Sequence, residues 1–359
     1  MYSSPSTSDS ANVPERAELA PTAVARLQKG EGFMSLRPVV KAAVVASLCW
    51  RGPALGAQQP ASPPSGRTSA RAVTLTYLGA AGWEITDGTT VILLDPYLSR
   101  IPLVANGSSL GRAESADRRP VDTNTIVVSD TAAADAHVRR ADFILLHHSH
   151  VDHILDVPYI ARKTGATVIG HESATNVMRG AGLPGSRLIT VRGGEDYVFG
   201  DLSIKVIPSV HSPLFQKHYY DGRTIPPTVK PPYKISDFAE GGSLAFLIRL
   251  GGHQILTFGS MNYIEREIDG LRPDIVLVGA GASRLEIYEY TSRLMRALGN
   301  PPVVLPTHWD NYFVPFTAPQ DTSVARLQSF VREVHAASPQ TRVIIPKYFI
   351  PITIPALKK

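Results

Sequence analysis

The sequence is very poor in cysteine, and this narrows the chemistry that the protein can use. Cys49 is the only cysteine among 359 residues, so we expect no disulfide within the chain. It lies in an apolar segment near the N-terminus, and we expect no thiolate to act as a nucleophile or metal ligand. Any metal site must therefore be built from His, Asp, Glu and Asn side chains.

A strong excess of charge is also missing from most of the chain. The formal net charge is +5, but residues 1–72 contain eight basic and four acidic residues and account for four of these five charges. The rest of the chain is nearly neutral and has no broad basic stripe of the kind that binds a phosphate backbone. We therefore expect a small-molecule substrate and no nucleic-acid partner.

Long apolar runs are scarce as well, and we expect no integral membrane segment in the mature chain. The apolar run 42–50 follows two basic residues, precedes small residues at 54–57, and is too short to span a bilayer permanently. This pattern is typical of a secretory signal peptide, so we expect a periplasmic or secreted protein, or a cytoplasmic one if the segment is no signal. The predicted order is a disordered leader (1–33), a signal peptide (34–57), a Pro/Ser-rich linker (58–72) and one domain (73–359).

The predicted domain begins with strand patterns and continues with strands that alternate with helices. Hydrophobic residues make up 43% of the chain, enough for a sizeable core. Two sheets packed together, with helices outside, suit this order of elements. Strands are predicted at 73–79, 82–86, 91–95, 143–146, 166–170, 202–210, 243–250, 253–259, 274–279, 302–306 and 342–346, and helices at 157–164, 173–181, 264–271, 291–298 and 323–337.

The strongest motif is a cluster of three imidazoles and a carboxylate that follows the apolar run 143–146. It consists of His148, His150, Asp152 and His153. In extended chain, His148 and His150 point to the same side and can reach one ion at about 2.1 Å. Asp152 and His153 continue around the turn and can face a second ion. Side chains crowded in this way would repel one another or remain unsatisfied without a cation.

Other candidate residues lie at the ends of predicted strands. His211 ends one strand and His308 follows another, and both are where a shared metal site would need them. Asp95 ends the strand 91–95 and can accept the free ring N–H of a ligand histidine, which would fix its tautomer. A turn-forming Asp-Pro pair is the alternative for Asp95.

This arrangement resembles the metallo-β-lactamase superfamily. The resemblance covers nearly all of 73–355. Within the superfamily, the motif followed by Ile154, Leu155 and Asp156 resembles the branch of ascorbate-6-phosphate lactonase-like enzymes. Enzymes that resemble N-acyl-phosphatidylethanolamine phospholipase D belong to a related branch. The resemblance to the superfamily implies a four-layer αβ/βα sandwich, a first metal held by His148, His150 and His211, and a second held by Asp152, His153 and His308.

One position departs from the pattern of that family. The family has an aspartate that bridges both metals after the strand 253–259, and Ser260 stands there instead. A neutral hydroxyl is a poor bridge between two dications, so we favour one tightly bound zinc ion, with two possible. Asn262 either supplies an oxygen ligand or caps the following helix.

The expected activity is that of a metal-dependent hydrolase with a metal-activated water. The resemblance implies a lactone or other ester substrate, with a phosphodiester as the alternative. A metal-binding protein without turnover is a further alternative. Asp152 and His153 are the candidate catalytic residues, and the candidate substrate-binding residues are Lys217, Tyr219, Tyr220, Trp309 and Tyr312.

The signal-peptide hypothesis makes a prediction about location. A chain expressed from Met34 in a Gram-negative host should reach the periplasm, and intact mass should show it shortened by about the length of the leader. A cytoplasmic product that still contains residues 34–57 would count against a signal peptide.

Overall fold

The computed structural model describes residues 70–102, 123–213, 217 and 222–357. The predicted leader, the signal peptide and most of the linker lie outside these ranges, so their roles and the location of the protein stay predictions. Strand β1 begins at Val73, where the sequence predicts the domain to start. In the described ranges, no helix is both long and apolar enough to cross a membrane.

The first sheet of the described region has seven strands and is half antiparallel, half parallel. In spatial order they are β16 (Pro351–Ile354), β1 (Val73–Gly79), β2 (Gly82–Thr86), β3 (Val91–Leu94), β5 (Phe143–Leu145), β6 (Thr167–Gly170) and β7 (Leu188–Thr190). From β16 to β3 the neighbours are antiparallel, and from β3 to β7 they are parallel. The parallel half places the carboxyl ends of β3, β5 and β6 at one edge.

The second sheet repeats this plan. Its seven described strands are, in spatial order, β15 (Arg342–Val343), β14 (Val303–Thr307), β13 (Ile275–Gly279), β12 (His253–Phe258), β11 (Ser243–Leu250), β9 (Leu202–Ser209) and β8 (Asp196–Phe199). β12 to β15 are parallel, and β8, β9, β11 and β12 are antiparallel. All five residues of β13 are buried, as expected for a parallel strand covered on both faces.

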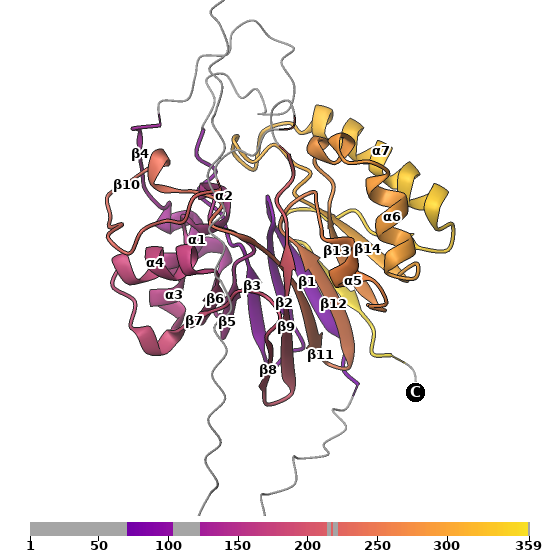
Figure 1. Ribbon diagram of the computed structural model, residues 1–359, viewed down its shortest axis with the longest axis horizontal. Helices are drawn as coiled ribbons and strands as arrows, with labels where there is room; N and C mark the ends of the chain where they lie inside the picture. The colour runs from indigo at the N-terminus through magenta and orange to yellow at the C-terminus, as the bar shows by residue number, and fades with distance from the viewer. Residues whose placement is uncertain (1–69, 103–122, 214–216, 218–221, 358–359) are drawn as a thin grey trace, which may run out of the picture. The chain divides into compact units, whose positions relative to one another are not determined.

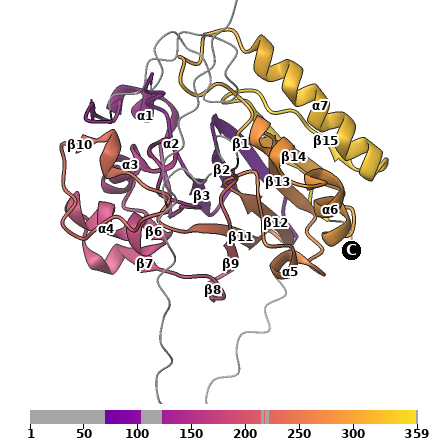
Figure 2. The ribbon, with the colours of Figure 1, turned by 45° about the horizontal axis from the view of Figure 1, so that its top comes forward.

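Helices cover the outer faces of both sheets (Figures 1 and 2). The first sheet is covered by α1 (Thr131–His137), α2 (Val151–Ile154), α3 (Val157–Thr164) and α4 (Glu172–Gly180), and the second by α5 (Glu265–Ile268), α6 (Tyr290–Ala297) and α7 (Asp321–Ala337). A short ribbon of β4 (Ile126–Val127) and β10 (Tyr233–Lys234) lies beside the first group.

Three apolar clusters hold these layers together. The central cluster contains residues of both sheets, among them Leu75 of β1 and Phe246 of β11. A second cluster joins the first sheet to α3 and α4, and a third joins the second sheet to α6 and α7. The order is therefore helices, sheet, sheet, helices, which is the predicted four-layer αβ/βα architecture.

Most predicted elements lie within one or two residues of the observed ones, but some were missed or misplaced. The predicted helix 173–181 begins earlier, because His171 is the N-cap residue of α4, and the Ser173 hydroxyl accepts a hydrogen bond from the backbone N–H of Ile225. The predicted helix 264–271 is only the single turn Glu265–Ile268. Four further elements were not predicted, because their sequences show no clear apolar periodicity: the strands β7, β8 and β16 and the helix α1.

Candidate metal centre

The motif residues and the two distant histidines converge where strands of both sheets end. His148 and His150 follow β5, and Asp152 and His153 lie on α2. His211 follows β9, and His308 comes directly after β14. Because the two sheets pack face to face, these strand ends bring side chains from distant parts of the sequence to one edge of the sandwich.

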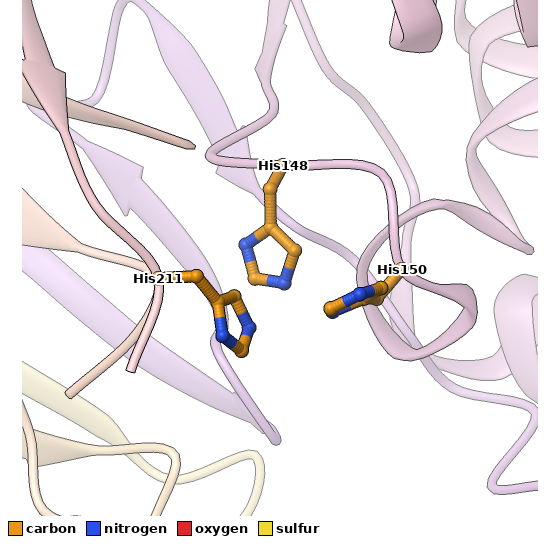
Figure 3. Close-up of side chains that lie close together, drawn as sticks. All are labelled: His148, His150 and His211. Carbon is orange, nitrogen blue, oxygen red and sulfur yellow. The ribbon is translucent and has the colours of Figure 1, made fainter. Parts of the chain in front are cut away.

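The first group consists of His148, His150 and His211, each of which is buried. The centroid distances are 4.8 Å from His148 to His150, 4.7 Å from His148 to His211 and 4.8 Å from His150 to His211. The rings are nearly perpendicular in pairs and turn toward one shared space, as Figure 3 shows. One ligand nitrogen from each ring lies within 4.8 Å of the other two.

The second group consists of Asp152, His153 and His308. Oδ2 of Asp152 lies 3.5 Å from Nε2 of His153 and 3.3 Å from Nε2 of His308. The ring of His153 lies 3.7 Å from that of His148, centroid to centroid, so the two groups are adjacent. The structure therefore brings together the six residues that the resemblance assigns to two metals.

Burial keeps the first group neutral at ordinary pH. Loss of solvent, reinforced by the neighbouring imidazoles, places the pKa of His148 well below its usual value. The same cause lowers the pKa of His150 to about 3 and that of His211 to about 4. Because a metal binds the deprotonated imidazole, these rings need lose no proton at neutral pH.

The second group carries charge. Burial alone would lower the pKa of His153, but Asp95 and Asp152 outweigh it and raise the pKa. Burial alone would raise the pKa of Asp152, yet His153 and His308 lower it below the usual range. Asp152 is therefore an ionised carboxylate at neutral pH.

The environment of His148 tests whether the residues fit a cation. Both of its ring nitrogens are buried and have no hydrogen-bond partner among the described residues. Leaving such a donor and acceptor unpaired is costly, and native structures seldom do so. A cation bound between the three imidazoles would use the free lone pair of His148. The donor set of nitrogens and one carboxylate, without sulfur, suits zinc.

Asp95 orients the second group, as its position in the sequence predicted. Its carboxylate accepts from the backbone N–H of His147 at 2.9 Å and lies 2.6 Å from Nδ1 of His147. The same oxygen lies 2.8 Å from Nδ1 of His153, which leaves Nε2 of His153 facing Asp152. Burial opposes its ionisation, but the two histidines lower its pKa to about 2.

A second buried carboxylate, Asp310, organises the turn that carries His308. It forms an ion pair with Arg100 at 2.8 Å and accepts from the hydroxyl of Tyr77 at 2.7 Å and the N–H of Ala80 at 3.0 Å. The N–H of His308 donates to the carbonyl of Ala80 at 2.7 Å. His308 has φ +54° and Ala80 has φ +50°, and strained backbone of this kind persists only where its surroundings hold it.

Ser260 and Asn262 stand beside His211, and the ligand alternative for Asn262 stays a prediction. The hydroxyl of Ser260 accepts from the backbone N–H of Ser212 at 3.0 Å. Asn262 donates from Nδ2 to the carbonyl of His211 at 3.1 Å, and its Oδ1 accepts from the N–H of Tyr263 at 2.9 Å. The helix-cap alternative for Asn262 is wrong, because the N-cap residue of α5 is Ile264. Both side chains brace the segment that holds His211.

The predicted substrate residues divide into those at the centre and those away from it. Tyr312 packs edge-on against His308, with centroids 4.8 Å apart, and its hydroxyl forms a hydrogen bond with Asp152. Trp309 is partly buried against the central cluster, where it stacks on Tyr348, and its role in substrate binding stays a prediction. Lys217 is exposed and pairs with Glu286. Tyr219 and Tyr220 lie outside the described residues.

A cavity of about 390 Å³ opens beside the centre and includes His211 in its lining. Its walls also contain His171, Arg192, Glu240 and Ser243. No motif in the sequence marks these four residues. His171 and Arg192 follow β6 and β7, Glu240 lies in the segment before β11, and Ser243 begins that strand.

The geometry of the fold and site is that of a metallohydrolase, and the comparisons agree. The family model described as "Beta-lactamase superfamily domain" matches residues 74–308, more than half of the chain. The chain belongs to the β-lactamase superfamily, which confirms the predicted fold class and superfamily. The narrower branch suggested by the motif stays a prediction.

The chain is similar to proteins named "UPF0173 metal-dependent hydrolase". The Thermus thermophilus relative is 24% identical over 269 residues, covering 74% of this chain and 96% of the relative. The Flavobacterium johnsoniae relative is 28% identical over 148 residues, covering 41% of this chain and 52% of the relative, so this match spans about half of that protein. The names of these relatives agree with the enzyme class predicted from the sequence.

Solved structures of the same fold are also similar. The isothiocyanate hydrolase from Delia radicum gut bacteria has a TM-score of 0.50 and 16% identity, with 79% of this chain and 100% of that chain covered. The metallo-β-lactamase fold protein YhfI from Bacillus subtilis has a TM-score of 0.47 and 13% identity, with 79% and 99% covered. At these identities the similarity concerns the fold alone.

Loss of a single ligand candidate should lower the amount of metal at the centre. We expect His150→Ala to remove the tight zinc that survives dialysis and His308→Ala to remove the weaker second ion from zinc-saturated protein, and each to reduce hydrolysis by more than about 100-fold, because each removes one donor from a small set. Elemental analysis of dialysed and of zinc-saturated protein measures the two ions. His335→Ala, exposed on α7, is the matched control and should change neither. Full metal content in His308→Ala would remove that residue from the site.

The serine in place of a bridging carboxylate should limit the number of tightly bound ions. We expect one equivalent of zinc after extensive dialysis, because no carboxylate at position 260 bridges two dications a few ångströms apart and offsets their repulsion. Ser260→Asp should raise the content toward two. Two equivalents of tightly bound zinc in the wild-type protein would contradict the mononuclear prediction.

Proposed function

We propose that this protein is a metal-dependent hydrolase that cleaves a lactone or another carboxylic ester. The proposal depends chiefly on two adjacent buried ligand groups, each with donor atoms within 4.8 Å of one another. A divalent cation bound there supplies Lewis acidity and lowers the pKa of a coordinated water toward neutrality. The relatives named as metal-dependent hydrolases support the reaction class. The resemblance of the motif to lactonase-like enzymes supports the ester.

In this proposal the six converging side chains hold the metal. His148, His150 and His211 would hold the tight ion, which we propose to be zinc. The rings are neutral and already face one space, so little rearrangement is needed to bind it. Asp152, His153 and His308 would hold a weaker second ion when one is present.

Two side chains are placed to handle the reacting groups. The ionised carboxylate of Asp152 can orient an attacking water and accept its proton. Tyr312 keeps its proton, because burial first and then the charge of Asp152 raise its pKa well above the usual value. Its hydroxyl can therefore donate a hydrogen bond to an oxygen on which negative charge develops.

A substrate panel tests the proposal. The zinc-loaded full chain is assayed with lactones, a chromogenic ester, bis(4-nitrophenyl) phosphate and nitrocefin, with and without a chelator. We expect turnover of lactone or ester that the chelator abolishes and added zinc restores. Asp152→Asn should lower kcat by at least about 100-fold, since it removes the proton acceptor.

The other outcomes of the panel contradict the proposal in different ways. Turnover of the phosphate diester alone would assign the protein to phosphodiesterases, and turnover of nitrocefin alone would indicate a β-lactamase. Bound zinc without turnover of any compound would favour a metal-binding protein.

A further inference from the structure

The cavity beside His211 extends from the candidate metal centre across the end of β9. Pro208 and Ser209 line it on that strand, and Ser243 lines it at the start of β11. The segment before β11 is hydrogen-bonded to the histidine motif, because the N–H of Ser149 donates to the carbonyl of Glu240 at 2.9 Å. A molecule that occupies the cavity therefore lies next to the residues of the metal centre.

Arg192 is exposed, and it lines this cavity. Its backbone lies in a turn that Glu195 and Gly193 hold in place. Both carboxylate oxygens of Glu195 are taken up by the turn, since they accept from the N–H groups of Arg192 and Gly193 at 2.8 Å each. Gly193 has φ +104°, and a Cβ there would lie 2.8 Å from Cγ of Pro208. The absence of that Cβ lets the turn pack directly against the end of β9.

Among the described residues, the guanidinium of Arg192 has no anionic partner. No hydrogen bond or ion pair joins it to another side chain in the described ranges, although the turn that carries it is ordered by Glu195. Such an arginine has an ordered backbone and a guanidinium whose N–H groups can still donate. It is suited to bind a carboxylate or a phosphate in two parallel hydrogen bonds.

His171 forms the wall next to Arg192. Its ring lies over Gly242, where a Cβ would come within 2.7 Å of Nε2. Burial is the main cause that lowers the pKa of His171, and Arg192 adds to it while Glu195 opposes it. The imidazole is therefore neutral at neutral pH and offers one N–H beside the guanidinium.

Glu240 is the acidic side chain that lines the same cavity, and it limits where an anion can lie. Its Oε1 accepts from the hydroxyl of Ser243 at 2.8 Å. An anion would avoid this wall and lie against Arg192 and His171.

We propose that this cavity is the subsite that anchors the substrate, and that Arg192 binds an anionic group of it, a carboxylate or a phosphate. This rests on the proposed function, because the scissile ester would lie at the metal centre while the anion lies in the cavity. The subsite selects substrates that carry their negative charge at a distance from the bond that is cleaved.

Two aryl esters of the same shape test this subsite in the zinc-loaded full chain. 4-Carboxyphenyl acetate is an anion, and 4-carbamoylphenyl acetate is its neutral counterpart. We expect Arg192→Ala to raise KM for the anionic ester about tenfold or more, the size expected for one charge-assisted hydrogen-bonded pair. The kcat for that ester and both constants for the neutral ester should change little.

Two further variants test whether the effect depends on the charge or the planar shape of the Arg192 side chain, and whether loss of any exposed arginine has the same effect. Arg192→Lys should recover only part of the loss, because lysine keeps the charge but not the planar fork. Arg266→Ala removes another exposed arginine, on α5 and paired with Glu267, and should leave both esters unaffected. An equal effect of Arg192→Ala on both esters would overturn the proposal.

Calorimetry keeps the subsite testable if neither ester is hydrolysed. Benzoate, phenyl phosphate and the neutral benzamide are titrated into zinc-loaded wild-type and Arg192→Ala protein. We expect the substitution to weaken at least one anion about tenfold and to leave benzamide unchanged, and the stronger anion identifies carboxylate or phosphate. Equal affinity of both proteins for both anions would overturn the subsite, whereas absent ester turnover would count only against the proposed function.

Discussion

The burial of several imidazoles in one place is the constraint on which the rest of the site depends. His148, His150 and His211 lie with ring centroids 4.7–4.8 Å apart, and burial keeps them uncharged. Both ring nitrogens of His148 are buried without a hydrogen-bond partner among the described residues, which costs free energy unless a cation uses the free lone pair. Metal binding and local stability are therefore coupled at this centre, and the strand ends around it must hold the rings close together.

Two carboxylates outside the proposed ligand set hold this arrangement in place. Asp95 ties the backbone of His147 to the ring of His153, and thereby selects the nitrogen that faces the centre. Asp310 ties the turn after β14 to Ala80 and Arg100, and so supports the strained backbone of His308. Both are fully ionised partners of buried groups, and each joins elements that are far apart in the sequence. The positions of the ligand candidates therefore depend on these two buried carboxylates.

The sequence predicted most of the strands and the histidine motif because each left a local pattern, whereas the four-layer architecture and the grouping of the six converging residues were implied by the resemblance to a family. Alternating apolar residues marked β1 and β9, and the spacing of the motif marked His148 and its neighbours. Long-range contacts leave no such pattern. The packing of Trp309 against the core depends on its stacking with Tyr348, and the role proposed for Arg192 depends on how its turn packs against β9. These residues could be assigned only once the two sheets were seen together.

The central claim is that buried imidazoles form the first coordination shell of a metal. Zinc K-edge X-ray absorption of the zinc-loaded full chain measures that shell directly. The account predicts nitrogen and oxygen neighbours at about 2.0–2.1 Å, outer scattering from at least three imidazole rings, and no sulfur. A shell of water oxygens without imidazole scattering would contradict the account, because the metal would then lie outside the histidine groups.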